Sequence, residues 1–248
     1  MRKILIFIIL VFFANIENFA QEEKKLSYQF DLGISIAFPY KQLIYTYKMY
    51  PMIMSTPYTE YKTDYGYYVE GLFKYNLKNK FSITSGFNYK YISYKIKDIW
   101  HININDGNIN NSTLSIPFLL NYKLSNKIPI TVSAGPYIEM IINAQEIGVT
   151  SFDTSKVMVI DPNDPMLKDQ DYNNDITNDY KMMNFGFSAQ LEYELKFNEK
   201  ISGILLSRFN YGLSNVLITD DEQNHKTAKS SANIWKNYNI LIGVGIRI

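Results

Sequence analysis

Alternation between apolar and polar side chains is the feature of this sequence that most limits how the chain can fold. In residues 183–197 every second side chain is apolar, and those between are polar or glycine. Successive side chains of a β-strand point to opposite sides, so this segment is predicted to be a strand with one apolar face. The same pattern runs through 27–38, 114–124, 129–140 and 238–248. The chain is therefore predicted to be all-β.

The connections between the predicted strands alternate in length. Eight strands are expected, at about 27–38, 64–77, 81–97, 111–124, 129–141, 183–197, 200–212 and 235–248. The tight turns are Asn76–Lys80, Ser125–Ile128 and Asn198–Lys200, and the long connections are 39–63, 98–110, 142–182 and 213–234. Short turns on one side and long loops on the other, with an even number of strands, are typical of an outer-membrane barrel. We expect an eight-stranded antiparallel transmembrane β-barrel with four long extracellular loops and short periplasmic turns.

The first twenty residues are predicted to be a cleaved signal peptide. Arg2 and Lys3 precede an apolar run from Ile4 to Phe13, and the segment ends at Ala20. A short basic region, an apolar core of about ten residues and a small terminal residue describe a secretory signal. A membrane anchor would need roughly 20 apolar residues. The predicted domains are therefore a signal peptide (1–20) and a barrel (21–248), with cleavage between Ala20 and Gln21.

Charge and composition exclude several classes of protein. The chain has 25 Lys+Arg and 24 Asp+Glu residues, so it lacks the broad basic surface that nucleic acid requires. It has no cysteine, which excludes disulfides and cysteine-bound zinc or iron–sulfur centres. The mean hydropathy of −0.18 is far below that of a polytopic helical membrane protein. No cofactor and no nucleic acid are expected.

The residues on the two faces indicate which one meets lipid. Small residues crowd the polar face: Gly33, Ser35, Ala37, Gly86, Gly135, Gly186, Ser188, Gly243 and Gly245. They suit the narrow interior of an eight-stranded barrel. Tyrosines gather near the strand ends of the bulky apolar face: Tyr28, Tyr65, Tyr75, Tyr122, Tyr193, Tyr211 and Tyr238. They suit the aromatic girdles of a membrane barrel. A monomeric barrel in outer-membrane lipid is predicted; a soluble lipocalin-like barrel is the alternative.

Several short motifs give the chain a family resemblance. The run 113–122, Thr-Leu-Ser-Ile-Pro-Phe-Leu-Leu-Asn-Tyr, resembles a strand of the PorT-type outer-membrane β-barrel family of Bacteroidota. The run 134–137, Ala-Gly-Pro-Tyr, and the run 208–216, Arg-Phe-Asn-Tyr-Gly-Leu-Ser-Asn-Val, are similar to two other motifs of that family, in the same order. The resemblance implies an outer-membrane barrel and a link to protein secretion.

Catalytic and metal-binding candidates are sparse. The two histidines, His101 and His225, both fall in predicted loops, with Asp98, Asp106, Ser93 and Ser112 near His101 in sequence. A hydrolase needs a nucleophile, a base and an orienting group that converge, and solvated loop residues are the favoured interpretation. In loop 142–182, Asp169, Asp171, Asn173 and Asp175 place oxygen donors at alternate positions, as in half of a calcium loop. Asn174 and Tyr180 occupy the positions that require glycine and glutamate, so an acidic, solvated surface loop is the favoured interpretation, and a site for calcium or another divalent ion is the alternative.

The remaining candidate site is the set of charged residues on the polar faces of the strands. They are Asp31, Glu70, Glu139, Glu192, Glu194, Lys74, Lys90, Lys123, Lys196, Arg208 and Arg247. The near balance indicates mutual pairing inside a closed barrel, because eight strands leave no continuous water channel. Glu139, Glu192, Glu194 and Arg208 are predicted to form a structural charge cluster. Folding the hairpin about 198–200 predicts that Arg208 pairs with Glu192 beside Gln190.

The function predicted from these observations is a non-enzymatic one. The four long loops are expected to present a binding or scaffold surface to an envelope or secretion-complex protein. Loop 142–182, about 40 mostly polar residues, is predicted to be the most exposed and least ordered part. A barrel enzyme acting on lipid or peptide, and a narrow pore, are the alternative hypotheses.

Overall fold

The computed structural model describes residues 26–42, 58–77, 80–100, 103–125, 128–152, 168–214 and 234–248. The predicted signal peptide and its cleavage site lie outside these ranges. The strands are β1 (Leu26–Gln42), β2 (Tyr58–Thr63), β3 (Tyr65–Asn76), β4 (Phe81–Trp100), β5 (Asn103–Lys123), β6 (Ile130–Phe152), β7 (Gln170–Asp175), β8 (Met183–Lys196), β9 (Ser202–Gly212) and β10 (Ile234–Arg247). A 3-10 turn, η4 (Thr177–Asp179), follows β7. Within the described ranges, no helix has the length and apolar character needed to cross a membrane.

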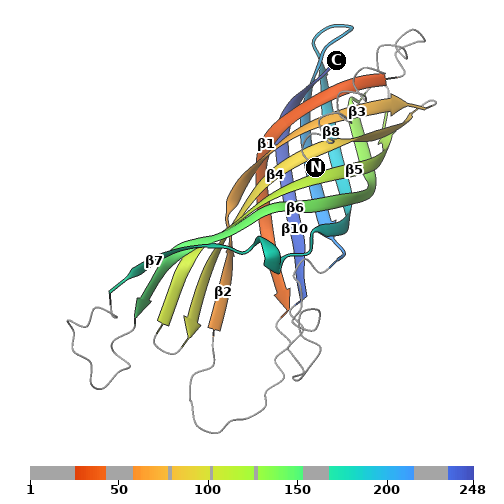
Figure 1. Cartoon of the computed structure of the whole chain (residues 1–248). Helices are drawn as coiled ribbons and strands as arrows, with labels where there is room; N and C mark the ends of the chain where they lie inside the picture. Colours follow the sequence, from red (N-terminus) through yellow and green to blue (C-terminus); the bar gives the residue numbers. More distant parts are fainter. Residues whose placement is uncertain are drawn as a thin grey trace, which may run out of the picture.

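The strands close into an antiparallel barrel of eight. Each barrel strand pairs with its neighbour in the chain, and β1 pairs with both β3 and β10, which joins the first strand to the last. β2 and β3 both pair with β4, one after the other along its length, and β7 pairs with β6 alone. Neither β2 nor β7 is therefore a separate strand of the barrel. The predicted fold class is therefore confirmed (Figure 1).

A bulge separates β2 from β3. Three residues, 64–66, lie between the pairs Thr63↔Tyr94 and Tyr67↔Tyr91, where β4 has only two. Asp64 accepts a hydrogen bond from the backbone of Tyr65 at 2.9 Å and one from the Ser93 hydroxyl at 3.3 Å. An extra residue bends the strand and increases its twist. The bulge therefore marks the level at which the sheet leaves the barrel.

The two faces of the strands lie as the alternation predicts. Large apolar side chains on the outer face are exposed, including Phe30, Leu32, Ile34, Val69, Phe87, Leu120, Phe185, Leu191 and Val244. Aromatic contacts mark both ends of this belt. Phe81 packs on Tyr122 at 5.1 Å between ring centroids at the end with short turns, and Tyr67 stacks on Tyr91 at 5.2 Å at the other end.

On β4 the belt runs from Phe81 to Tyr91. Ten residues span roughly 33 Å along the strand, or about 25 Å along the axis of a tilted barrel, which is the height of the apolar band in outer-membrane barrels.

The lengths of the strands differ from the prediction on the side with long connections. The predicted loop 98–110 is wrong, because β4 and β5 pair as far as Trp100↔Asn103. The predicted loop 142–182 is wrong in part, since β6 continues to Phe152 and β7 pairs with it. The three tight turns are confirmed in position by the ends of the strands that they join. The reason for the error is composition: asparagine, aspartate and glycine, which are uncommon in strands, make up all of 103–111 except Ile104 and Ile109.

Small residues on the inner face make room for two large ones. A Cβ atom added to Gly186 would overlap the ring of Tyr137, and one added to Gly243 would overlap the hydroxyl of Tyr68. Both tyrosines are buried inside the barrel. Tyr68 packs there with the apolar side chains Ile204, Leu206 and Leu241. The irregular face of β9, where the alternation is weakest, is thus the place where the barrel holds a small apolar core.

Candidate functional site

The charged side chains inside the barrel form ion pairs at three levels. Lys74, Glu192 and Arg247 lie nearest the short turns, Glu70 and Arg208 lie at mid-height, and Lys90 and Glu139 lie above them. All of these side chains are at most 10% exposed. Burying unpaired charges costs several kcal/mol per ion. The sequence satisfies this requirement for these residues by placing opposite charges on inner faces of different strands. Asp31 is also buried, but there it accepts a hydrogen bond from Gln29 at 2.7 Å and forms no ion pair with another described residue.

Arg208 pairs with Glu70, not with Glu192. Its two terminal nitrogens donate to the carboxylate of Glu70 at 2.6 and 3.0 Å, and its Nε donates to Gln190. Asn88 donates to the same carboxylate at 2.9 Å. The register Gln190↔Arg208 and the contact with Gln190 agree with the prediction, but the ion pair reaches across the barrel from β9 to β3. A bidentate pair of this kind is the strongest form of arginine–carboxylate contact.

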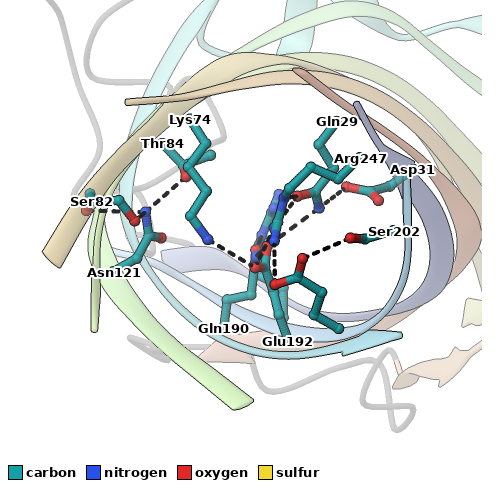
Figure 2. A network of polar contacts seen from close by, with 12 residues as sticks. Gln29, Asp31, Lys74, Ser82, Thr84, Asn121, Gln190, Glu192, Ser202 and Arg247 are labelled. Carbon is teal, nitrogen blue, oxygen red and sulfur yellow. Dashed lines mark hydrogen bonds and ion pairs between the residues drawn. The ribbon is translucent and has the colours of Figure 1, made fainter. Parts of the chain in front are cut away.

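Glu192 belongs instead to the level nearest the short turns (Figure 2). Arg247 donates to it at 2.7 Å, Lys74 lies 3.7 Å away, and Gln190 donates to it at 2.7 Å. Arg247 also donates to Gln29 and lies 3.5 Å from Glu194, which accepts a hydrogen bond from Ser202. This level links β1, β3, β8, β9 and β10. Gln29 was not singled out from the sequence, although its place on the polar face of the first strand is the signal that could have found it.

The upper level passes into an apolar cap. Lys90 contacts Glu139 and lies 5.7 Å from the ring centre of Tyr137. Beyond this pair an apolar cluster occupies the inner side, beside buried asparagines such as Asn111 and Asn239. The cluster consists of Ala37, Ile92, Tyr94, Ile96, Ile109, Ile141, Ala144 and Tyr180. Tyr180 follows η4, so the chain between β7 and β8 folds inward to complete the cap. Burial raises the pKa of Tyr180 to about 12. The cap lies on the side of the long connections.

The four residues of the predicted charge cluster therefore share one interior without forming one cluster. Glu192 and Glu194 lie at the same level and share Arg247, whereas Glu139 and Arg208 lie at other levels with other partners. Lys90, Arg208 and Glu139 are at most 2% exposed. Water-filled passages need exposed polar side chains along the lumen. Among the described residues, these ion-paired side chains are buried inside the barrel.

A second site lies where the sheet continues past the barrel. We define the extension as β2, residues 94–100 of β4, 103–109 of β5, 145–152 of β6, and β7. These five strands pair in the order β2–β4–β5–β6–β7. Figure 1 shows them leaving the barrel as one sheet that leans away from the rest of its rim. The extension is built almost wholly from residues predicted to be loops.

One tyrosine, Tyr172, packs across the inner face of the extension. Tyr172 on β7 lies level with Gly148 and Gly107 on the next two strands. Its hydroxyl lies 2.7 Å from where a Cβ of either glycine would be, and it donates to Glu146 at 3.1 Å. An aromatic ring laid over glycines covers backbone that would otherwise be bare. Tyr172 thus stabilises the pairing of β7 with β6.

The outer face of the extension carries a shallow depression of about 720 Å³. It is lined by Lys95, Asp106, Gly107, Asn108, Ile147, Gly148, Val149, Asp171, Tyr172 and Asn173. The lining combines a cation, two carboxylates, two amides and two apolar side chains. Such a mixture can hydrogen-bond and desolvate a ligand at once. Asp106 is the one candidate near His101 that the structure places in this depression.

The other predicted candidates do not converge. The side chains of Asp98, His101 and His225 lie outside the described residues. Ser93 and Ser112 bond to Asn110 and Tyr89 on neighbouring strands. Residues 170–175, the core of the calcium-like run, form the straight strand β7, which spaces its donors along a line and cannot wrap them around an ion. Among the residues that the structure describes, no group of three His, Asp or Glu side chains could hold a metal ion.

Comparison with known proteins gives one family and several similar structures. The family described as "Outer membrane protein beta-barrel domain" matches residues 19–217. OprG from Pseudomonas aeruginosa is 12% identical over 90% of this chain and 95% of that chain, with a TM-score of 0.40. Ail from Yersinia pestis, in complex with the heparin analogue sucrose octasulfate, is 9% identical over 90% and 99%, with a TM-score of 0.39. No curated protein matches the chain.

Proposed function

This chain belongs to the outer membrane protein β-barrel domain family and resides in the outer membrane, and we propose that it is a non-enzymatic binding protein whose extension presents a site to a partner outside the cell. The extension is the observation that carries the proposal. Strands β4, β5 and β6 contain 20, 21 and 23 residues, whereas β8 and β9 contain 14 and 11. About ten residues suffice to cross the membrane. The surplus length has no role in spanning lipid.

The depression is the part of the extension best suited to a ligand. Its walls come from β4, β5, β6 and β7, so the site depends on strands paired beyond the membrane. Asp106 and Asp171 are exposed there, and Ile147 is 40% exposed beside them. Exposed carboxylates next to an apolar side chain favour a ligand with a cationic group and an apolar part. A basic segment of an envelope protein has this chemistry.

The family resemblance of the motifs supports a scaffold role as the finer form of this proposal. The motif 113–122 lies in β5, 134–137 lies in β6, and 208–212 lies in β9. If the PorT-type resemblance extends to function, the partner is a component of a secretion complex. The packed interior favours this role over a pore, because ion pairs and the apolar cap fill the space that a conducting path would need.

Site-specific crosslinking in intact cells tests the proposal. A photo-crosslinking residue replaces Ile147 in the depression, and a matched variant carries it at Ile128, which is 52% exposed in a short turn at the other end of the barrel. We expect an adduct of defined mass from position 147. Adding Asp106→Asn and Asp171→Asn should remove it, and the adduct from position 128 should be unaffected by them. No adduct at 147, or one that survives both substitutions, would contradict the proposed site.

A further inference from the structure

One carboxyl group inside the barrel has no cation. Asp31, on the inner face of β1, is 2% exposed. Gln29 donates a hydrogen bond to its Oδ2 at 2.7 Å (Figure 2), and no described residue donates to its Oδ1. The other carboxylates of the three levels all form ion pairs; they are Glu70, Glu139, Glu192 and Glu194. A buried carboxylate is costly to keep ionised without a cation, so Asp31 must be neutralised in another way.

The neighbour of Asp31 on β3 is a second carboxyl group. Asp31 lies directly opposite Glu70 in the pairing of β1 with β3, and both side chains are buried on the inner face. Their carboxyl oxygens lie within hydrogen-bonding distance of each other. A Cβ atom added to Gly245 would lie 1.7 Å from Oδ1 of Asp31, so the carboxyl group rests against the backbone of β10. Two carboxyl groups this close cannot both be ionised at low cost, and such a pair typically shares a proton.

The two arginines of the interior direct their donors to other side chains. Arg208 donates to Glu70 through both terminal nitrogens and to an amide of β8 through Nε. All three nitrogens of Arg247 donate to side chains of β1 and β8. No described cation therefore forms an ion pair with Asp31. The other titratable groups that face it are Tyr68 on β3 and Glu192 on β8.

We propose that Asp31 binds a proton at neutral pH and donates it in a hydrogen bond to the carboxylate of Glu70. Asp31 then accepts from Gln29 and donates to Glu70, so it connects the level nearest the short turns with the level at mid-height. Glu70 keeps its negative charge for Arg208. A proton suits the site better than a metal ion, because the described residues include no group of three His, Asp or Glu side chains that could hold one.

A bound proton links the stability of the barrel to pH. Free aspartate loses its proton near pH 4, so at neutral pH the chain takes up about one proton when it folds. The stabilisation is complete below pH 4 and is lost as the pH rises through the titration of the folded site. Between about pH 5 and 7, each pH unit should therefore lower the equilibrium constant for folding by about tenfold, relative to a chain without the site.

Urea unfolding at several pH values tests this link. The full chain is folded into lipid vesicles as the wild type, as Asp31→Asn and as the control Asp171→Asn. Asparagine at position 31 can donate to Glu70 without having a proton to lose. The folding constant of Asp31→Asn, relative to the wild type, should rise by about tenfold for each pH unit between about 5 and 7. Asp171→Asn should follow the wild type. The same pH dependence in Asp31→Asn and wild type would overturn the proposal.

Infrared spectroscopy detects the proton directly, because a protonated carboxyl group has a carbonyl band that a carboxylate lacks. The wild type should show this band at neutral pH, Asp171→Asn should keep it, and Asp31→Asn should lose it. Glu70→Gln should lose it too, since Asp31 can then ionise beside Arg208. A band that survives Asp31→Asn would contradict the site.

The wild type alone gives a further readout if Asp31→Asn fails to fold. Its carbonyl band should disappear as the pH is raised into the alkaline range. A wild type without the band at neutral pH would overturn the proposal. If its stability also rose with sodium concentration at constant ionic strength, a cation would occupy the place assigned to the proton.

Discussion

The barrel interior and the extension use the same strands to place charge in two opposite ways. Inside the barrel, Lys90 and Arg208 are fully buried and each lies against a carboxylate from a different strand. On the outer face of the extension, Lys95 and Asp106 are exposed, and no ion pair joins them to another described residue. Buried pairs are destabilising to break, whereas exposed charges are nearly free to vary. The difference supports the proposal that the extension, rather than the interior, contacts a partner.

The sharpest test of this contrast removes one carboxylate from each region. Glu70→Gln leaves the Arg208 guanidinium buried without its bidentate carboxylate partner. We expect the free energy of unfolding to fall by about 3–5 kcal/mol. Asp31 lies opposite Glu70 on β1, so the loss should fall near the lower end of that range. Asp171→Asn in the extension should change stability by less than about 0.5 kcal/mol. Urea midpoints in lipid vesicles measure both.

The same experiment separates the observed ion pair from the one predicted from the sequence. Glu192→Gln removes the ion pairs of Glu192 with Arg247 and Lys74, but leaves the ion pair between Arg208 and Glu70. Gln190 links the two pairs, because it accepts from Arg208 and donates to Glu192, so the double variant Glu70→Gln/Glu192→Gln should depart from additivity by about 0.5 kcal/mol or more. It should still be clearly less stable than Glu192→Gln alone, and equal urea midpoints for these two variants would show that Arg208 depends on Glu192 after all.

The two regions also share a tyrosine packed over glycine, and this offers a smaller effect. Gly186→Ala forces the buried ring of Tyr137 to move inside the barrel, and overpacking of this kind typically costs about 1–3 kcal/mol. Gly148→Ala pushes against the backbone of Asp106 and Gly107 on β5 as well as against Tyr172, so the strain falls on the pairing of β5, β6 and β7 within the extension. We expect a lower urea midpoint only for Gly186→Ala, and faster amide exchange in β7 only for Gly148→Ala. Global destabilisation by Gly148→Ala would mean that the extension and barrel unfold together.

Sequence alone predicted the barrel because alternation survives wherever one face meets lipid and the other the interior. The faces of β8 and β10 are therefore correct almost residue by residue. The extension was missed because water covers its outer face, so residues such as Asp106 and Asn108 can occupy a strand without an apolar face to mark it. Cross-barrel pairs were missed for another reason: Glu70 and Arg208 lie 138 residues apart and meet only when the barrel closes.

The smallest expected effect lies at the root of the extension, where β7 turns back toward the barrel. Hydrogen bonds from the side chain and backbone of Thr177 hold the pKa of Asp175 below its ordinary value, and the backbone bond is 2.9 Å long. A depressed pKa means that the folded state favours the ionised carboxylate. This contribution is present above the unfolded pKa, near 4, and is lost as the pH falls through the lower folded value.

The Thr177 amide resonance, followed by NMR from neutral to acidic pH, should therefore titrate with a midpoint below 4. Thr177→Ala removes the side-chain hydrogen bond, which is the larger cause of the shift, and should move that midpoint upward. Asp175→Asn should abolish the titration while the ion pairs inside the barrel, far from this turn, keep the urea midpoint unchanged. A midpoint at the ordinary value in the wild type would mean that the turn after β7 does not hold Asp175. The extension would then be attached to the barrel rim through β2, β4, β5 and β6, without a contribution from the turn after β7.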